Sequence, residues 1–345
     1  MSKFSGLKSF LWSIFLLSGL FFCSRTALAG PVVKIGHVAP PFHGQHVGLK
    51  YFAQYLDEHS NGRWQCKIFP SGQLGGERSL AEQVQTGTLP MAVITTAVLS
   101  NFVPQIGVVD LPFLFPDLQT AHAVLDGPIR KKLFACFPAR GFVALTFMEN
   151  EFRDLTNSKH PIHTPADLKG LKIRTMESPI FIDTFKALGA EPVPMPFPEV
   201  YSALEQGVID GQDNPLFVSI LVKFPEVNHF ITKSQHVLTE TVMIANRDFW
   251  ARLTPADKKL FRTAATEATI INRATNLQGE LNLPRIGKSI PAYLREKKIE
   301  CVELTPEEQQ QFKQAVAPVY KKYRTKIGAE IFDAMLARVK EQQGE

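Results

Sequence analysis

An arginine at the end of a predicted strand is the first residue whose position suggests chemistry. In "GLKIRTMESPIF", residues 170–181, apolar residues alternate with cations up to Arg174, and Ser178 then begins a helix. A guanidinium group can hold a carboxylate, sulfonate or phosphate with two hydrogen bonds. The amides of a helix N-terminus add positive potential nearby. Arg174 is therefore a candidate anion ligand, and a surface salt bridge is the alternative explanation.

An aromatic and an amide side chain follow the next two strands of the same region. After the strand that ends at Arg174, extended segments at 191–195 and 208–210 alternate with helices, and Phe197 and Asn214 follow them. The binding crevice of a parallel sheet lies beyond the carboxyl ends of its strands. Pockets for small molecules commonly combine apolar surface with a few polar groups in this way.

Other motifs for catalysis or metal binding are weak in this sequence. Two histidine pairs have a spacing that occurs at metal sites: His43 with His46, and His160 with His163. Neither pair is accompanied by a clustered third ligand. There is no nucleophile elbow, dinucleotide fingerprint or P-loop, and Asp210 and Asp213 are interpreted as turn caps. We therefore expect no metal and no cofactor.

The N-terminus has the features of a secretory signal peptide. Lys3 and Lys8 precede an apolar run at 10–22, which is shorter than the roughly 20 residues of a membrane span. The letters "ALA" then form a cleavage pattern that ends at Ala29. Cleavage there removes three cations from a formal net charge of +5 and leaves +2, which is too small for a nucleic-acid surface. We expect a periplasmic protein with no nucleic-acid partner.

Three cysteines follow the predicted cleavage site: Cys66, Cys136 and Cys301. Export permits disulfides, but an odd number with wide spacing offers no disulfide framework. Their apolar surroundings favour buried thiols that act as small hydrophobic residues.

Strands and helices alternate along the rest of the chain. The first part runs strand 32–38, helix 45–58, strand 65–69, a helix closed by Gly87, and strand 90–96. This order is typical of a parallel sheet covered by helices. Long strands are expected at 141–149 and 238–246. Three helices are predicted to begin at a capping threonine followed by proline: at Thr164, Thr254 and Thr305.

Four segments resemble the solute-binding proteins of TRAP transporters (tripartite ATP-independent periplasmic transporters). They are "FPSGQLGGERSLAEQVQTGTLPMAV", "DLPFLF", "DLKGLKIRTMESP" and "ALGAEPVPMPFPEVYSALEQGVIDGQDNP". The resemblance implies an α/β periplasmic-binding-protein (Venus-flytrap) fold of two domains. Each domain would be a mixed sheet flanked by helices, with the long helix after Thr254 across both. We assign residues 1–29 to the signal peptide, 30–149 plus 237–279 to domain I, and 150–236 plus 280–345 to domain II.

The resemblance also implies which residues contact a ligand between the domains. The carboxylate-binding arginine of the family matches Arg174, an assisting cation matches Arg153, the ligand-contacting asparagine matches Asn214, and the aromatic wall matches Phe197. Further contacts of sialic-acid-type members fall on Glu77, Thr95 and Glu177. Those members have an acid in place of Thr95 and an amide in place of Glu177, which argues against sialic acid. Glu149 and Asn150, just before Arg153, are candidates to bind ligand hydroxyls.

These residues lead to the hypothesis of an extracytoplasmic solute-binding protein rather than an enzyme. Its ligand would be a small organic anion: a carboxylate such as a hydroxy or sugar acid, or a sulfonate. The resemblance implies delivery to the small and large membrane subunits of a TRAP transporter, and we expect a monomer. Two alternatives stay open. One is a secreted enzyme acting on a small acidic substrate, with Glu77 or Glu177 as base or nucleophile. The other is a binding protein that feeds a sensor.

Overall fold

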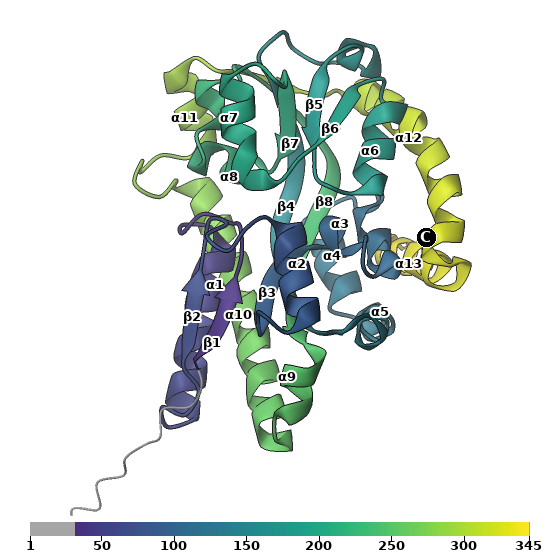
Figure 1. Ribbon diagram of the computed structural model, residues 1–345. Coiled ribbons are helices and arrows are strands. Elements are labelled where there is room, and N and C mark those ends of the chain that lie inside the picture. The colour runs from purple at the N-terminus through teal and green to yellow at the C-terminus, as the bar shows by residue number, and fades with distance from the viewer. Residues whose placement is uncertain (1–31, 345) are drawn as a thin grey trace, which may run out of the picture.

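The computed structural model describes residues 32–344, which form two α/β halves around one mixed sheet (Figure 1). The predicted signal peptide lies outside the described residues. The strand order is β2-β1-β3-β8-β4-β7-β5-β6, and β9 pairs with β8. The strands are β1 Val33–Gly36, β2 Cys66–Phe69, β3 Met91–Thr95, β4 Phe142–Asn157, β5 Lys172–Thr175, β6 Glu191–Pro194, β7 Gly211–Asn214, β8 Phe230–Asn246 and β9 Glu300–Glu303.

Each half contains one parallel group of strands. In the lower half of Figure 1, β1 pairs in parallel with β2 and β3; in the upper half, β5 pairs in parallel with β6 and β7. Helices pack on both faces of these groups, as strand–helix–strand connections require. The two-domain α/β fold expected from the sequence is therefore confirmed.

Two long antiparallel strands, β4 and β8, join the halves and pass through both of them. The sequence predicted only the segments 141–149 and 238–246. The remainder of β4 carries buried charged residues, among them Arg153 and Asp154. Its sequence is therefore as polar as that of a typical loop. The register shifts between Glu149 and Phe152, where Glu151 has a φ of 67°. A bulge thus interrupts β4 where the two halves meet.

The helices cover both halves. They are α1 Gly44–His59, α2 Glu77–Thr86, α3 Thr96–Leu99, α4 Leu118–Leu125, α5 Pro128–Phe134, α6 Pro179–Ala187, α7 Val200–Glu205, α8 Leu216–Leu221, α9 Arg247–Arg252, α10 Pro255–Leu281, α11 Ile290–Lys297, α12 Pro306–Ile327 and α13 Ala329–Gln343. Thr254 and Thr305 cap α10 and α12 as expected, because each side chain accepts a hydrogen bond from the third backbone amide of its helix.

The helix α10 contacts both halves, as the resemblance implied. It lies along α1, and a Cβ atom on Gly48 would be only 2.5 Å from the carbonyl oxygen of Ala268. Further along, a Cβ atom on Gly279 would be 2.3 Å from the ring of Phe217 in α8. Glycine at these two positions therefore allows α10 to approach one helix of each half closely.

Three local predictions were wrong. The strand expected at 208–210 lies at Gly211–Asn214, because the polar side chains of "QDN" are buried and paired rather than solvated. The segment after Thr164 forms only a 3-10 helix, Pro165–Leu168, although its capping box is present. The three cysteines are free and half-buried, not fully buried.

The C-terminal helices connect the two halves a second time. α12 packs on α6 of the upper half and on the 3-10 helix Pro104–Asp110 of the lower half, and α13 packs on α4 and α5. In Figure 1, α12 descends along the right side and α13 lies at its lower end, beside α4. The proposed domain division assigned all of 280–345 to domain II, whereas α13 contacts helices of domain I.

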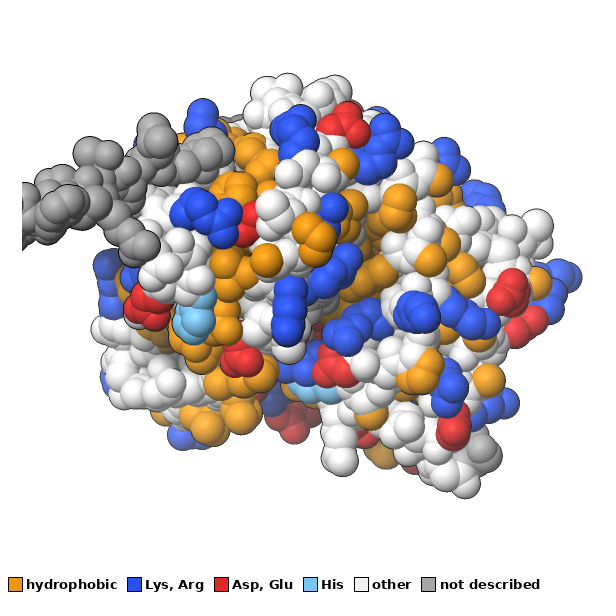
Figure 2. Space-filling view, turned by 90° about the horizontal axis from the view of Figure 1, so that it is seen from below, with side chains coloured by type: hydrophobic (Ala, Val, Ile, Leu, Met, Phe, Trp, Pro, Cys, Tyr) orange, Lys and Arg blue, Asp and Glu red, His pale blue; other side chains and the backbone are white. Residues whose placement is uncertain are grey.

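The surface carries charges of both signs. Figure 2 shows Lys and Arg side chains across the lower face, with Asp and Glu side chains and apolar patches among them. This mixture fits the small net charge expected for the mature chain. Within residues 32–344, none of the helices combines the length and the apolar character that a membrane span requires.

Candidate ligand-binding cleft

A cavity that is partly open to solvent, with about 410 Å³ of empty space, lies where strand ends of the two halves meet. The lower half contributes Val38, Ala39, Pro40, Gln45, Glu77 and Thr95; β4 and the upper half contribute Asn150, Arg153, Arg174, Met176, Phe197, Asn214 and Val218. Seven of the nine candidate site residues therefore line one cavity, and both halves contribute to its wall.

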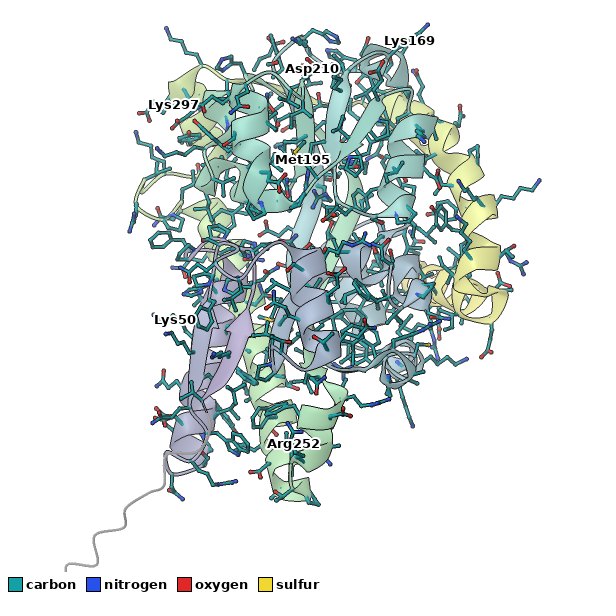
Figure 3. The ribbon with its side chains drawn as sticks, in the orientation of Figure 1. Lys50, Lys169, Met195, Asp210, Arg252 and Lys297 are labelled. Atoms are coloured by element: carbon teal, nitrogen blue, oxygen red, sulfur yellow. The ribbon has the colours of Figure 1, made fainter. Side chains whose placement is uncertain are left out.

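Arg174, near the end of β5, lines the cavity and has unused hydrogen-bonding capacity. Its Nε and Nη2 atoms donate to the carbonyl oxygen of Met195, at 3.0 Å and 2.7 Å. Figure 3 shows Met195 inside the upper half. The Nη1 atom is buried and has no hydrogen-bond partner among the described residues. Burial, and secondly the charge of Arg153, lowers the pKa of Arg174 to about 10. An anion in the cavity would supply the missing acceptor.

Arg153, by contrast, is already paired. Its Nε atom donates to Asp213 Oδ2 at 2.6 Å, and its Nη2 atom donates to the carbonyl oxygen of Asp213. His236 Nε2 lies 3.4 Å from the same carboxylate oxygen. Burial alone would raise the pKa of Asp213, but the charge of Arg153 and the neighbouring His236 outweigh burial and hold the pKa well below its usual range. Asp213 is therefore the counter-ion of Arg153, not a turn cap.

An acid and a hydroxyl form the wall contributed by the lower half. Glu77 begins α2 and Thr95 ends β3. The two oxygens of Glu77 accept hydrogen bonds from the backbone amide of Thr95 at 2.9 Å and from its hydroxyl at 2.6 Å. Burial raises the pKa of Glu77, while these hydrogen bonds and the charges of Arg174 and Arg153 act in the opposite direction.

Three amide side chains add neutral polar groups. Gln45, in the first turn of α1, approaches Asn150 Oδ1 at 3.5 Å and donates to Thr241 Oγ1 at 3.3 Å. Asn214, at the end of β7, donates to Gln212 Oε1. Figure 3 places Asp210, just before β7, at the top of the upper half, so β7 runs from there toward the cleft. Gln45 was missed in the sequence because it lies in a predicted helix, 105 residues from Asn150.

Phe197 supplies an aromatic wall. It is half-buried, lines the cavity, and packs edge-on against Phe224 with a centroid distance of 6.0 Å. Together with Met176 and Val218 it makes one side of the cavity apolar. Such a surface can cover the carbon skeleton of an organic acid.

Glu149 and Glu177 are not brought to the wall of this cavity. Glu149 lies in β4 but turns toward α4 and α10, where its oxygens contact His122 Nε2 at 2.7 Å and Asn276 Nδ2 at 3.3 Å. Glu177 lies beyond β5, and its backbone carbonyl accepts a hydrogen bond from Asn101. Successive side chains of a strand point to opposite faces of the sheet. The sequence motif alone did not show toward which face the side chain of Glu149 points.

The histidine pairs form ordinary hydrogen bonds. His46 contacts His37 at 3.1 Å, and His163 contacts Glu308 at 3.0 Å. Residues 32–344 contain no group of three His, Cys, Asp or Glu side chains arranged to hold a metal ion.

Comparisons with known proteins identify the family. The profile of "Bacterial extracellular solute-binding protein, family 7" matches residues 35–326. The 2,3-diketo-L-gulonate-binding periplasmic protein of Escherichia coli is 36% identical over 262 residues, which cover 76% of this chain and 80% of that protein.

Two solved structures have the same fold. A TRAP periplasmic solute-binding protein from Polaromonas, bound to D-erythronate, superposes with a TM-score of 0.83 at 38% identity and covers 89% of this chain and 98% of its own. The sugar acid binding protein from Advenella mimigardefordensis, in complex with galactonate, gives a TM-score of 0.85 at 33% identity, with 90% and 98% covered. The chain therefore belongs to family 7 of the bacterial extracellular solute-binding proteins, the periplasmic solute-binding proteins of TRAP transporters.

Proposed function

We propose that this protein captures a small organic acid in the cleft between its two halves. The observation that carries the proposal is Arg174, whose buried Nη1 atom points to no acceptor within the described part of the chain. A ligand carboxylate would accept from it, Asn214 would fix the orientation, and Phe197 would cover the carbon skeleton. Arg153, held by Asp213, would add positive potential. The relatives named above bind diketogulonate, D-erythronate and galactonate, all organic acids.

The bound acid is then delivered to the small and large membrane subunits of a TRAP transporter. Members of the family are periplasmic and work with such subunits, which supports this step. We propose that the protein acts as a monomer and is not an enzyme. Both oxygens of Glu77 already accept hydrogen bonds from Thr95, and Glu177 is not at the cavity wall. The relatives named above are binding proteins, which supports this part of the proposal.

Removal of the Arg174 side chain tests the proposal. The probes are D-erythronate, D-galactonate and succinate, and the measurement is calorimetric titration of the tightest binder among them. Arg174→Ala should weaken binding by about 2–5 kcal/mol, because the ligand carboxylate would be buried without its partner. Arg174→Lys keeps the charge but loses the planar fork, so we expect an intermediate loss.

Lys172→Ala is the matched control. Lys172 lies on the same strand, two residues earlier, with an exposed side chain, and we expect unchanged affinity. Equal affinity of Arg174→Ala and the unsubstituted protein for the same acid would contradict the proposed function.

A further inference from the structure

We propose that the cleft selects hydroxylated monocarboxylates and discriminates against acids with a second carboxylate. The proposal rests on the function proposed above and names the ligand class of that cleft. It arises from the charged and amide side chains that line the cavity.

The cavity offers one cation whose hydrogen-bonding groups are not already used. Arg174 has an Nη1 atom without an acceptor within residues 32–344. Arg153 is neutralised by Asp213, with both side chains at most 1% exposed. A first carboxylate of the ligand pairs with Arg174. A second one would find only Arg153 among the described lining cations, and Asp213 already pairs with that guanidinium. A buried charge without a free partner is strongly unfavourable.

The wall contributed by the lower half carries an acid instead of a cation. Glu77 is 7% exposed, and its carboxylate already receives two hydrogen bonds from Thr95. A carboxylate has about four acceptor sites, so Glu77 can accept two more hydrogen bonds. A ligand hydroxyl can donate them, whereas a ligand carboxylate cannot and would be repelled.

Neutral amides extend this hydroxyl-binding wall. Gln45 and Asn150 come from α1 and β4, approach each other at 3.5 Å, and both line the cavity. Each amide has one acceptor oxygen and a donor group, which suits a hydroxyl that both donates and accepts. Gln45 Nε2 already donates to Asn150 Oδ1 and Thr241 Oγ1, so the carbonyl oxygen of Gln45 and Nδ2 of Asn150 are the groups left for a ligand hydroxyl. An acid that lacks hydroxyls would leave these two groups unpaired, and such mismatches are strongly discriminated.

Matched pairs of ligands test the selection by calorimetric titration of the unsubstituted protein. D-Erythronate is compared with meso-tartrate, and D-galactonate with galactarate, because each pair differs only in whether the far end is a hydroxymethyl group or a carboxylate. Butyrate and hexanoate lack the hydroxyls. The reference is whichever of D-erythronate and D-galactonate binds more tightly. We expect the diacid and the unhydroxylated acid of the same chain length each to bind at least tenfold more weakly than this monoacid. A diacid that binds as tightly as its partner, or no binding of either monoacid, would overturn the proposal.

Glu77→Gln identifies the residue that discriminates. It keeps the shape of the side chain and removes its charge, so the affinity ratio of monoacid to diacid should fall at least tenfold. Glu82→Gln on the same helix, where the side chain is 55% exposed, should leave the ratio unchanged. The thermal midpoint of each ligand-free variant verifies folding. An unchanged ratio in Glu77→Gln would overturn the assignment.

The two proposals fail in different ways. If diacids bind equally well but Arg174→Ala abolishes binding, the class assigned here is wrong and the function as an organic-acid binder stands. If binding of every acid is independent of Arg174, the proposed function itself is wrong.

Discussion

At the scale of single residues, the pairing of Arg153 with Asp213 carries a prediction about stability. Both side chains are buried, so Asp213→Asn leaves a guanidinium charge in the interior without its counter-ion. Loss of one partner from a buried pair costs about 3–5 kcal/mol. We expect the free energy of unfolding at pH 7, measured with urea, to fall by this amount.

The same substitution has a pH signature. The pKa of Asp213 is held well below its usual range in the folded state. Its stabilisation is therefore present above the unfolded pKa, about 3.9, and is lost as the pH falls through the lower folded pKa. The stability gap between the unsubstituted protein and Asp213→Asn should narrow below about pH 4. Asp248→Asn, at an exposed ion pair with Arg247, is the control and should change stability by less than about 0.5 kcal/mol. A gap that is independent of pH would contradict the assignment.

Residues differ in how far the sequence reveals their roles. Arg174 could be found because a cation at a strand end before a helix start has a local pattern, and the structure places it at the cavity. Asp213 and Gln45 could not be found in this way. Their roles depend on partners 60 and 105 residues away along the chain, and no local spacing encodes such a contact.

At the scale of elements, the two long strands place two glutamates opposite each other. Glu240 in β8 is the register partner of Glu149 in β4. Glu240 is fully buried, and neither of its carboxyl oxygens has a hydrogen-bond partner within the described residues. Burial, and then the charge of Glu149, raises the pKa of Glu240 well above its usual value, although Arg273 acts in the opposite direction.

This raised pKa predicts that Glu240→Gln stabilises the protein at neutral pH. Below the unfolded pKa of about 4.3, Glu240 is protonated in both states and the substitution should matter least. As the pH rises, the unfolded state ionises while the folded state keeps the proton, so the folded state loses relative stability by at most about 1.4 kcal/mol per pH unit. Urea unfolding at intervals from pH 4 to pH 7 measures the gap. Glu300→Gln on the exposed face of β9 is the control. A gap that stays constant between pH 4 and pH 7 would show that Glu240 is ionised when folded.

The same buried charges explain which elements could be predicted. The short strands of the parallel groups contain many apolar residues, and the sequence predicted their positions to within a few residues. The second half of β4 and the whole of β7 contain Arg153, Asp154 and the "QDN" run, whose charges are compensated only by neighbours in three dimensions. Hydrophobic periodicity fails for such segments.

At the scale of the whole molecule, we expect the two halves to move when a ligand binds. Arg174 and Glu77 are 3% and 7% exposed in this structure, so we expect an acid to reach them more readily when the halves separate. The division into two halves followed from the family resemblance. The packing of α13 on the lower half could not be predicted, because the sequence of an amphipathic helix does not specify which half the helix covers.

Ligand binding should therefore make the protein more compact. The halves would rotate about the bulged segment of β4 and its neighbour β8, as hinge-closing proteins do. In small-angle scattering, the ligand-free protein should have a larger radius of gyration than the structure gives, and addition of D-erythronate or D-galactonate, whichever binds, should reduce it to that value. Stability should rise in parallel, by about 2.7 kcal/mol at a ligand concentration of one hundred times Kd. Arg174→Ala should show neither change at the same concentration. If the radius of gyration is the same with and without ligand while the stability rises, the cleft is closed before binding and access must occur without rotation of the halves.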